Sequence, residues 1–300
     1  MTHSVLSDFS STENPSAPWS IMSEIEKAIR EKIESIGTPL REWDIRINFG
    51  IKTGFNDAFI ISGETRDRIL SMCYSPAERE RTAEIIRPIL RGRDIARYGY
   101  HWADLWVINT HNGIKDSIDR IHIEDYPAIR QHLDQYWDRI ESRADQGDTP
   151  YNLRNCAYLD DLSRPKIIWG EISDKSKFCL DENGEYYPEA TTFMLSGDNL
   201  YYLLAFLNCS VSEYVFSTIG TTTGVGTVRW KKYKILELSV PNHLSLSQEE
   251  QISNLCKEVV RLKRAGSPDF AEAERALNHA VYSVYGLTAT EIEYIEHQIS

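Results

Sequence analysis

The stretch from residue 46 to residue 62 constrains the fold of this chain more than any other part of the sequence. Two short apolar runs, 45–49 and 58–61, flank a turn that contains Gly50 and Gly54. Alternation in the first run and β-branched residues in the second favour strands. Glycine tolerates the backbone angles and close approaches that such a turn requires. We therefore expect two strands around an exposed loop, in the simplest case an ordinary hairpin.

The polar side chains of this turn suit contacts with nucleic acid. Lys52 supplies a cation, Thr53 a hydroxyl and Asn56 a carboxamide, and the loop leaves backbone N–H groups free. Protein–DNA interfaces use these groups to contact phosphates and base edges. By its chemistry alone, the turn is compatible both with a DNA contact and with a plain connection between strands.

Length and cysteine use define the class of protein. A chain of 300 residues forms one large or two small domains with ample buried core. No apolar run approaches the roughly 18 residues of a membrane helix, and residues 1–4 show no secretion signal. The five cysteines are scattered, which is typical of reduced thiols and indicates neither a disulfide frame nor a zinc site. We expect a cytoplasmic protein without membrane contact.

Cationic residues cluster in two places on an otherwise acidic chain. The net charge is −12, and segment 178–228 carries six acids and no Lys or Arg. Phosphate neutralisation supplies most non-specific DNA affinity, so an acidic chain needs local cationic patches to bind DNA. Four cations lie between 229 and 234, and six arginines between 79 and 97. This pattern predicts modest DNA affinity for the chain alone and a more basic partner.

Several distinctive segments follow one another along the chain. They are Gly50-Ile51-x-Thr53-Gly54-x-Asn56-x-Ala58-Phe59, Pro88-x-Leu90-x-Gly92-x-Asp94-Ile95-x-Arg97-Tyr98, Tyr126-Pro127, Arg143-x-Asp145-x-Gly147 with Leu153-Arg154, Pro165-Lys166-Ile167-Ile168-Trp169, and more loosely 281–288. In this order they resemble the TaqI-like C-terminal specificity domain. This domain is the target-recognition part of many adenine-N6 DNA methyltransferases, of fused restriction–methylation enzymes and of BREX phage-defence methyltransferases.

The resemblance implies a mixed α/β (α+β) recognition domain. It would have a mixed or antiparallel sheet, flanking helices and a C-terminal helical appendage. We expect a disordered tail at 1–18, a helical segment at 19–45, a DNA target-recognition domain at 46–241 and the appendage at 242–300.

Local patterns predict the individual elements. Periodicity and caps predict helices at 20–36, 75–86, 125–143, 200–209, 247–262, 270–285 and 289–299. Strands are expected at 106–109, 164–169 and 233–240, with a hairpin over 177–194 whose turn is Asn183-Gly184. Ser247 and Glu250 read as a capping box, and the apolar seam that follows them is expected to pack on the N-terminal helix.

Four groups of side chains are the candidate DNA contacts. Arginine and lysine are expected on phosphates, and the polar loops on base edges. The expected phosphate contacts near the opening turn are Lys52, Arg91, Arg93 and Arg97, with Thr53 and Asn56 beside them. The loop 143–154 contributes Arg143, Asp145, Gln146, Tyr151, Asn152 and Arg154. The start of the strand expected at 164–169 contributes Lys166. The loop 220–232 contributes Thr222, Thr223, Arg229, Lys231 and Lys232.

Each group has a plainer interpretation. The arginines can be ion-paired with Asp94 and Glu84, and loops are polar because they are solvated. For the DNA interpretation we expect loops 143–154 and 220–232 side by side on one rim, forming a positively charged concave surface.

No complete catalytic constellation is present in the sequence. The histidines are scattered, Glu171-Ile172-Ser173 lacks the lysine of a nuclease motif, and no Gly-x-Ser-x-Gly motif or methyltransferase cofactor loop occurs. We therefore expect no cofactor in this chain and no catalysis by it alone. The resemblance implies double-stranded DNA and a methyltransferase that binds S-adenosylmethionine as partners, with or without a nuclease, in bacterial restriction–modification or phage defence. The alternatives are a protein-interaction or DNA-mimicking adaptor, and a hydrolase with unrecognised motifs.

Overall fold

The computed structural model describes residues 23–219, 221–222 and 228–299. The expected disordered tail at 1–18, the first residues of the helix expected from 20, and Thr223 lie outside the described residues. Among the described residues, no helix is both long and apolar enough to span a bilayer.

A four-stranded antiparallel sheet forms the centre of the molecule. Its strand order is β10 (Phe178–Asp181), β8 (Lys166–Gly170), β12 (Thr192–Gly197) and β2 (Ile45–Phe49). Alternate residues face opposite sides, so Trp169 and Phe193 join one hydrophobic cluster, whereas Met194 joins another. The sheet therefore separates two cores.

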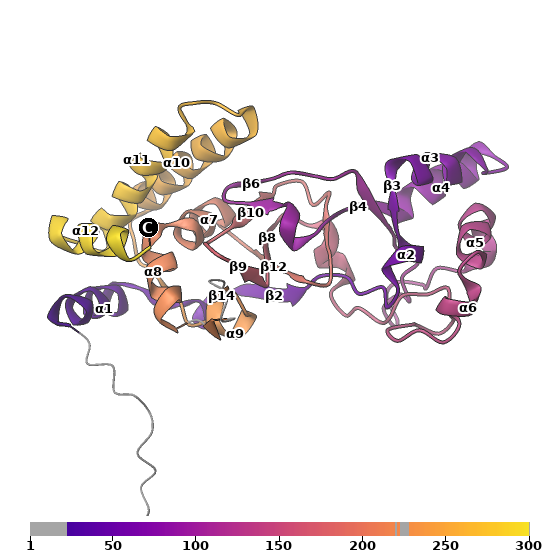
Figure 1. Cartoon of the computed structure of the whole chain (residues 1–300), viewed down its shortest axis with the longest axis horizontal. Coiled ribbons are helices and arrows are strands. Elements are labelled where there is room, and N and C mark those ends of the chain that lie inside the picture. Colours follow the sequence, from indigo (N-terminus) through magenta and orange to yellow (C-terminus); the bar gives the residue numbers. More distant parts are fainter. Residues whose placement is uncertain (1–22, 220, 223–227, 300) are drawn as a thin grey trace, which may run out of the picture.

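The N-terminal helix and five helices from the last third of the chain cover one side of this sheet. They are α1 (Glu24–Ile36), α7 (Leu200–Asn208), α8 (Ser210–Ile219), α10 (Leu246–Ala265), α11 (Phe270–Val284) and α12 (Ala289–Gln298). The yellow helices α10–α12 lie at one end of the elongated molecule (Figure 1). One continuous hydrophobic cluster runs from Ile29 to Ile295, so these helices and the sheet share a core. The division at 45/46 and 241/242 stays a prediction.

A second lobe lies at the opposite end of the molecule (Figure 1). Its mixed sheet has the order β11 (Tyr187–Pro188), β4 (Ile86–Leu90), β7 (Leu105–Ile108) and β3 (Ile60–Ser62). Its helices are α2 (Asn56–Phe59), α3 (Gly63–Ser71), α4 (Pro76–Ile85), α5 (Pro127–Asp134) and α6 (Trp137–Ile140). The expected mixed α/β class is confirmed.

The remaining elements are short. The small strands are β1 (Thr38–Pro39), β5 (Ile95–Ala96), β6 (Gly99–Tyr100), β9 (Ile172–Ser173), β13 (Thr221–Thr222), β14 (Val228–Arg229) and β15 (Ser239–Val240). The short helices are η1 (Leu40–Glu42), η2 (Gly92–Asp94), η3 (Ile123–Asp125), η4 (Leu159–Ser163) and α9 (Lys232–Ile235).

Both expected hairpins are wrong. Strand β2 pairs with β12, whereas β3 pairs with β7 in the other sheet, and residues 56–59 between them are helical. Strand β10 pairs with β8, and β11 pairs with β4. Gly184 has the positive φ of a turn but Asn183 does not, so the turn is not of type I′. Each turn signal marks a change of direction, while pairing is decided by distant strands.

Three further predictions need correction. Residues 232–235 form helix α9 where a strand was expected. The N-cap of α10 is Ser245, whose capping box uses Gln248 and not the expected Ser247 and Glu250. The α10 seam packs on α7 and α11. The N-terminal helix instead meets α12, where Lys32 Nζ lies 2.6 Å from a carboxylate oxygen of Glu291.

Candidate nucleic-acid interface

One end of the central sheet brings the sequence-predicted segments together. In the register of the sheet, Phe49 at the end of β2 and Trp169 near the end of β8 both flank Phe193 at the start of β12. Neighbouring strands lie about 4.8 Å apart, so the ends of β2 and β8 are about 10 Å apart. The turn 50–56 follows β2 there, and residues 171–174 follow β8.

Two glycines fix the turn against its neighbours. A side chain at Gly50 would place a Cβ 2.0 Å from the Glu189 carbonyl oxygen, and one at Gly54 1.9 Å from that of Ala144. Gly54 also has a φ of +70°. Only glycine permits these contacts, and the second attaches the turn to the loop 143–154.

Polar cavities surround this end of the sheet. One of about 490 Å³ is lined by Asn56, Arg91 and Arg93. A second, of about 600 Å³, is lined by Arg93 and Arg229. A third, of about 340 Å³, is lined by Lys52 and Arg154. Residues from all the expected cationic segments thus surround the ends of β2 and β8.

Three of the predicted cations have neither an ion pair nor a side-chain hydrogen bond among the described residues. Lys52 and Arg93 are exposed, and Lys231 is half-buried. Every salt bridge found in the described part of the chain involves other cations. Their charges are available to phosphate without breaking an existing pair.

Arg91 and Arg97 are engaged inside the protein. Arg91 forms a two-pronged pair with Asp94, with Nη2 2.7 Å from Oδ1 and Nε 2.9 Å from Oδ2. Burial acts to raise the pKa of the Asp94 carboxyl, but hydrogen bonds from Arg91 outweigh it and the pKa is lowered. Arg97 joins Glu213 of α8 at 3.3 Å and Glu274 of α11 at 2.7 Å. The plainer interpretation, with Asp94 as a partner, therefore describes Arg91.

Two polar residues of loop 143–154 are buried and hold the loop together. Arg143 stacks over the ring of Phe59 at 4.7 Å and donates to the Asn152 carbonyl at 2.7 Å. Burial lowers the pKa of Arg143 to about 10, so it stays protonated near neutral pH. The Asn152 carboxamide donates to the Ile121 carbonyl at 2.8 Å and accepts from the Thr149 hydroxyl at 2.7 Å. Neither side chain is free to read a base.

The remaining residues of this loop are accessible to different degrees. Gln146 is exposed. Arg154 pairs with Asp145 at 2.8 Å, and the Tyr151 hydroxyl donates to Asp134 at 2.5 Å. Such half-exposed pairs contribute only about 0–1 kcal/mol, so DNA can displace them at small cost.

Lys166 is buried completely and cannot touch DNA. It is 0% exposed, and its ammonium group donates to Asp181 at 2.7 Å and to the Leu162 carbonyl at 2.8 Å. Burial lowers the pKa of Lys166, and Asp181 offsets part of that effect. The expected phosphate contact at the start of this strand is therefore wrong, since the strand is internal to the sheet.

At the opening turn and in the loop 220–232, most described side chains lie against the protein. The Thr53 hydroxyl is buried and donates to Asn56, which is exposed. Arg229 pairs with Glu171 at 3.1 Å, and Lys232 donates to the Ile47 carbonyl on the free edge of β2 at 2.7 Å. Thr222 is in strand β13, and its side chain lies outside the described residues, as does all of Thr223.

The two expected reading loops attach to the same end of the sheet but line different cavities. Loop 143–154 contacts the turn after β2, whereas β14 pairs with β9, which follows β8. The cavity that Arg154 lines contains no residue of 229–232, and the cavity that Arg229 lines contains none of 143–154. The single concave surface expected from the sequence is thus divided into at least two hollows.

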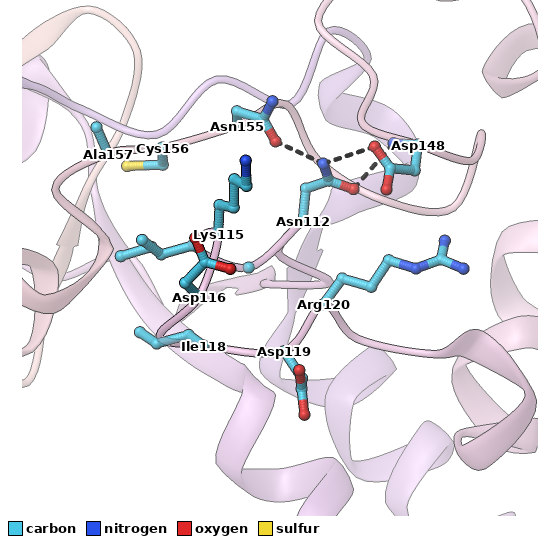
Figure 2. Close-up of a pocket in the computed structure, with 12 residues that line it drawn as sticks. Asn112, Lys115, Asp116, Ile118, Asp119, Arg120, Asp148, Asn155, Cys156 and Ala157 are labelled. Carbon is cyan, nitrogen blue, oxygen red and sulfur yellow. Dashed lines mark hydrogen bonds between the residues drawn. The ribbon is translucent and has the colours of Figure 1, made fainter.

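Sequence reasoning missed a further polar hollow beside this loop. Figure 2 shows Lys115 and Arg120 in it, with the Asn112 amide bonded to Asn155 at 2.5 Å and to Asp148 at 3.0 Å. Lys115 and Arg120 have no ion-pair partner among the described residues, but Asp116 and Asp119 share the cavity. In the sequence, Gly113 is the residue that could have indicated the turn beside this hollow. In the structure it has a φ of +71°.

Most acids of the stretch 178–228 bind partners within the fold. Asp181 pairs with Lys166, Glu182 with Arg264 and Glu213 with Arg97. Glu189 accepts from the Thr191 hydroxyl at 2.6 Å. These acids therefore do not form a strip of free charge that resembles a DNA backbone.

Comparison with known proteins gives one family and several relatives. Residues 87–240 match the sequence model of the TaqI-like C-terminal specificity domain. The chain is 24% identical over 290 residues to the type II methyltransferase M.PaeR7I of Pseudomonas aeruginosa, covering 93% of this chain and 44% of that protein. The chain thus spans less than half the length of the curated relative.

Two solved structures are similar in fold. The type IIL restriction–modification enzyme MmeI, solved in complex with DNA, has a TM-score of 0.60 and 13% identity over 87% of this chain and 36% of its own. The type IIG restriction endonuclease BpuSI has a TM-score of 0.51 and 12% identity over 88% of this chain and 33% of its own.

Proposed function

This chain belongs to the TaqI-like C-terminal specificity domain family, and from that premise we propose that it recognises a short duplex DNA sequence for an adenine-N6 methyltransferase. The chain provides recognition, and the methyltransferase, which binds S-adenosylmethionine, carries out the chemistry on a flipped adenine. With a nuclease fused to or associated with that enzyme, the proteins would form a restriction–modification or phage-defence system. Such a protein acts in the cytoplasm, where the DNA is.

The observation that carries this proposal is the gathering of cationic segments at one end of the central sheet. Lys52, Arg93 and Lys231 have free charges there, and Arg154 and Arg229 are held only by half-exposed ion pairs. Phosphate contacts fix the register of a protein on DNA. We assign that role to these five cations.

Base reading falls to the exposed polar groups beside these cations. Asn56 and Gln146 are exposed in the turn and in the loop 143–154. A carboxamide can make two hydrogen bonds to adenine in the major groove, and each such pair discriminates by about 1–3 kcal/mol. Thr222 and Thr223 remain candidates for the loop 220–232. The units proposed at 46–241 and 242–300 would act together, because helices and sheet share one core.

The adaptor alternative has less support. A DNA mimic needs free acids in a row, whereas five of the six acids in 178–228 bind partners within the fold.

A chimera tests the proposal. The chain replaces the aligned segment of M.PaeR7I, and methylated adenines are mapped by single-molecule sequencing of the host DNA. We expect methylation at a sequence different from that of the parent enzyme, and a Gln146→Ala, Asn56→Ala chimera that relaxes it. Methylation of the unchanged parent site by the chimera would show that specificity does not reside in this chain.

A further inference from the structure

The cavity beyond the end of β2 differs from its neighbours in charge. The cavity of about 340 Å³ is lined by Lys52 and Arg154 and by no Asp or Glu. The three other cavities described above each contain acids. On a chain with a net charge of −12, a cation-lined and acid-free hollow is a place where an anion is favoured.

The same cavity contains a buried polar group without a partner. Asn109 is only 5% exposed, and its Oδ1 has no hydrogen-bond donor. Buried acceptors in native proteins are nearly always paired, so an unpaired one requires an explanation. A half-turn of the carboxamide exchanges Oδ1 and Nδ2, so Asn109 can offer either an acceptor or a donor to a ligand.

Other polar groups of the wall add donors. His111 accepts at Nδ1 from the Gly113 backbone N–H at 3.2 Å, so its hydrogen lies on Nε2. Asn155 also lines the cavity and continues into the neighbouring hollow (Figure 2). The wall thus has the hydrogen-bonding groups that recognise the edge of a base.

Aromatic side chains complete the lining. Phe49 is 48% exposed although it packs against Phe193, and Tyr158 lines the same cavity. An exposed aromatic ring at the end of a strand offers a face on which a base can stack. The cavity therefore combines aromatic faces, amides and cations within one hollow.

We propose that this cavity binds one nucleotide that is not paired in a duplex. The base lies against Phe49 and Tyr158 and bonds to Asn109, and the phosphate lies near Lys52 and Arg154. The shared chemistry is an aromatic base that carries a phosphate, and its source is an extrahelical nucleotide of the DNA or a free mononucleotide. The inference rests on the proposed DNA recognition for the first source only.

Binding of matched duplexes tests the proposal. The full 300-residue chain is titrated, by fluorescence anisotropy, with a paired 20-base-pair duplex and with the same duplex carrying one extra unpaired adenine. We expect the unpaired nucleotide to tighten binding about tenfold, which corresponds to ~1.4 kcal/mol. A separate arm adds dAMP as competitor and reports whether a free nucleotide occupies the cavity.

Two variants locate the effect. Phe49→Ala removes an exposed ring and should make the affinities for the two duplexes about equal. Tyr74→Ala removes an exposed aromatic ring from the other lobe and should keep the preference for the unpaired nucleotide. Asn109→Asp, which adds a negative charge to the cavity that must hold an anionic nucleotide, should abolish this preference. Binding of dAMP that Phe49→Ala abolishes would support a free nucleotide as the source.

The outcomes separate the inference from the proposed function. Equal affinity for both duplexes with no dAMP binding would overturn the inference but leave DNA recognition intact. A preference that survives in Phe49→Ala would overturn the assignment to this cavity. If neither duplex binds but dAMP does, the nucleotide pocket stands and the proposed DNA recognition fails.

Discussion

The loop 143–154 and the segment 229–232 have similar polar compositions, but their side chains are used differently. In the loop, Arg143 and Asn152 face inward and bond to backbone carbonyls. In the segment, Lys231 is free, and Lys232 lies against the edge of β2. A loop without regular secondary structure must satisfy its own backbone, so part of its polarity serves the fold. Polar composition alone therefore does not identify a reading surface.

The same contrast separates the lysines. Lys166 and Lys231 are equally charged in the sequence, yet one is buried against Asp181 and the other has no ion-pair partner in the described part of the chain. Burial divides the predicted DNA contacts into those that build the site and those that are available to DNA. The following variants challenge that division.

The largest effect is expected at the buried lysine. Lys166→Met leaves the Asp181 carboxylate buried without its cation, which costs about 3–5 kcal/mol of folding free energy. Urea unfolding followed by circular dichroism measures the loss. Lys231→Met is the matched control and should change stability by less than about 0.5 kcal/mol. Equal stability of the two variants would refute the assigned roles.

A smaller effect is expected inside the loop. Asn152→Ala removes the donor to Ile121 and the acceptor for Thr149, and should destabilise the protein by about 1–3 kcal/mol. Gln146→Ala, an exposed amide of the same loop, should leave stability within about 0.5 kcal/mol. Thermal melts of both variants decide the comparison. If the Asn152→Ala variant were as stable as the wild type but recognised a different DNA sequence, Asn152 would be a base contact and not a structural residue.

The smallest effect concerns pH. The pKa of His132 is lowered, and burial is the largest cause. The nearby Arg68 lowers this pKa further, whereas the hydrogen bond between Nε2 and the Ala58 carbonyl oxygen, at 2.9 Å, raises it. The folded state then binds a proton less readily than the unfolded state, so stability falls as the pH drops below about 6.5. Unfolding titrations at pH 5 and pH 7 should show a smaller pH dependence for His132→Gln. The exposed His101→Gln should keep the wild-type profile, and identical profiles for all three proteins would contradict the assignment.

The elements that the sequence predicted well are those with a complete local pattern. Helix α4 begins at the expected Ser75 cap, and the apolar run at 200–208 is a buried helix. A cap or an apolar face is encoded within a few residues. The arginine segment 88–98, which resembles the family in a fixed order of residues, likewise lies within the residues 87–240 that match the family.

The failures share a different physical cause. Strand β2 pairs with a strand about 150 positions later, and no local pattern specifies that partner. The fate of each cation also depends on contacts between distant segments. Arg97 meets Glu274, and Asn109 is left without a donor, because of packing that neither sequence neighbourhood contains. The fold class was predictable from sequence, whereas the accessible part of the site was not.

The salt dependence of DNA binding tests the central claim most directly. The complex with the proposed methyltransferase partner is titrated against duplex DNA at several salt concentrations, using the wild type and a Lys52→Gln, Arg93→Gln, Lys231→Gln variant. Each lost phosphate contact lowers the slope of log affinity against log salt by about 0.9, so we predict a slope reduced by roughly 2.7. An Arg30→Gln, Lys257→Gln, Arg261→Gln variant changes the net charge equally on the distant helices and should keep the wild-type slope. Equal slopes for the two variants would contradict the account.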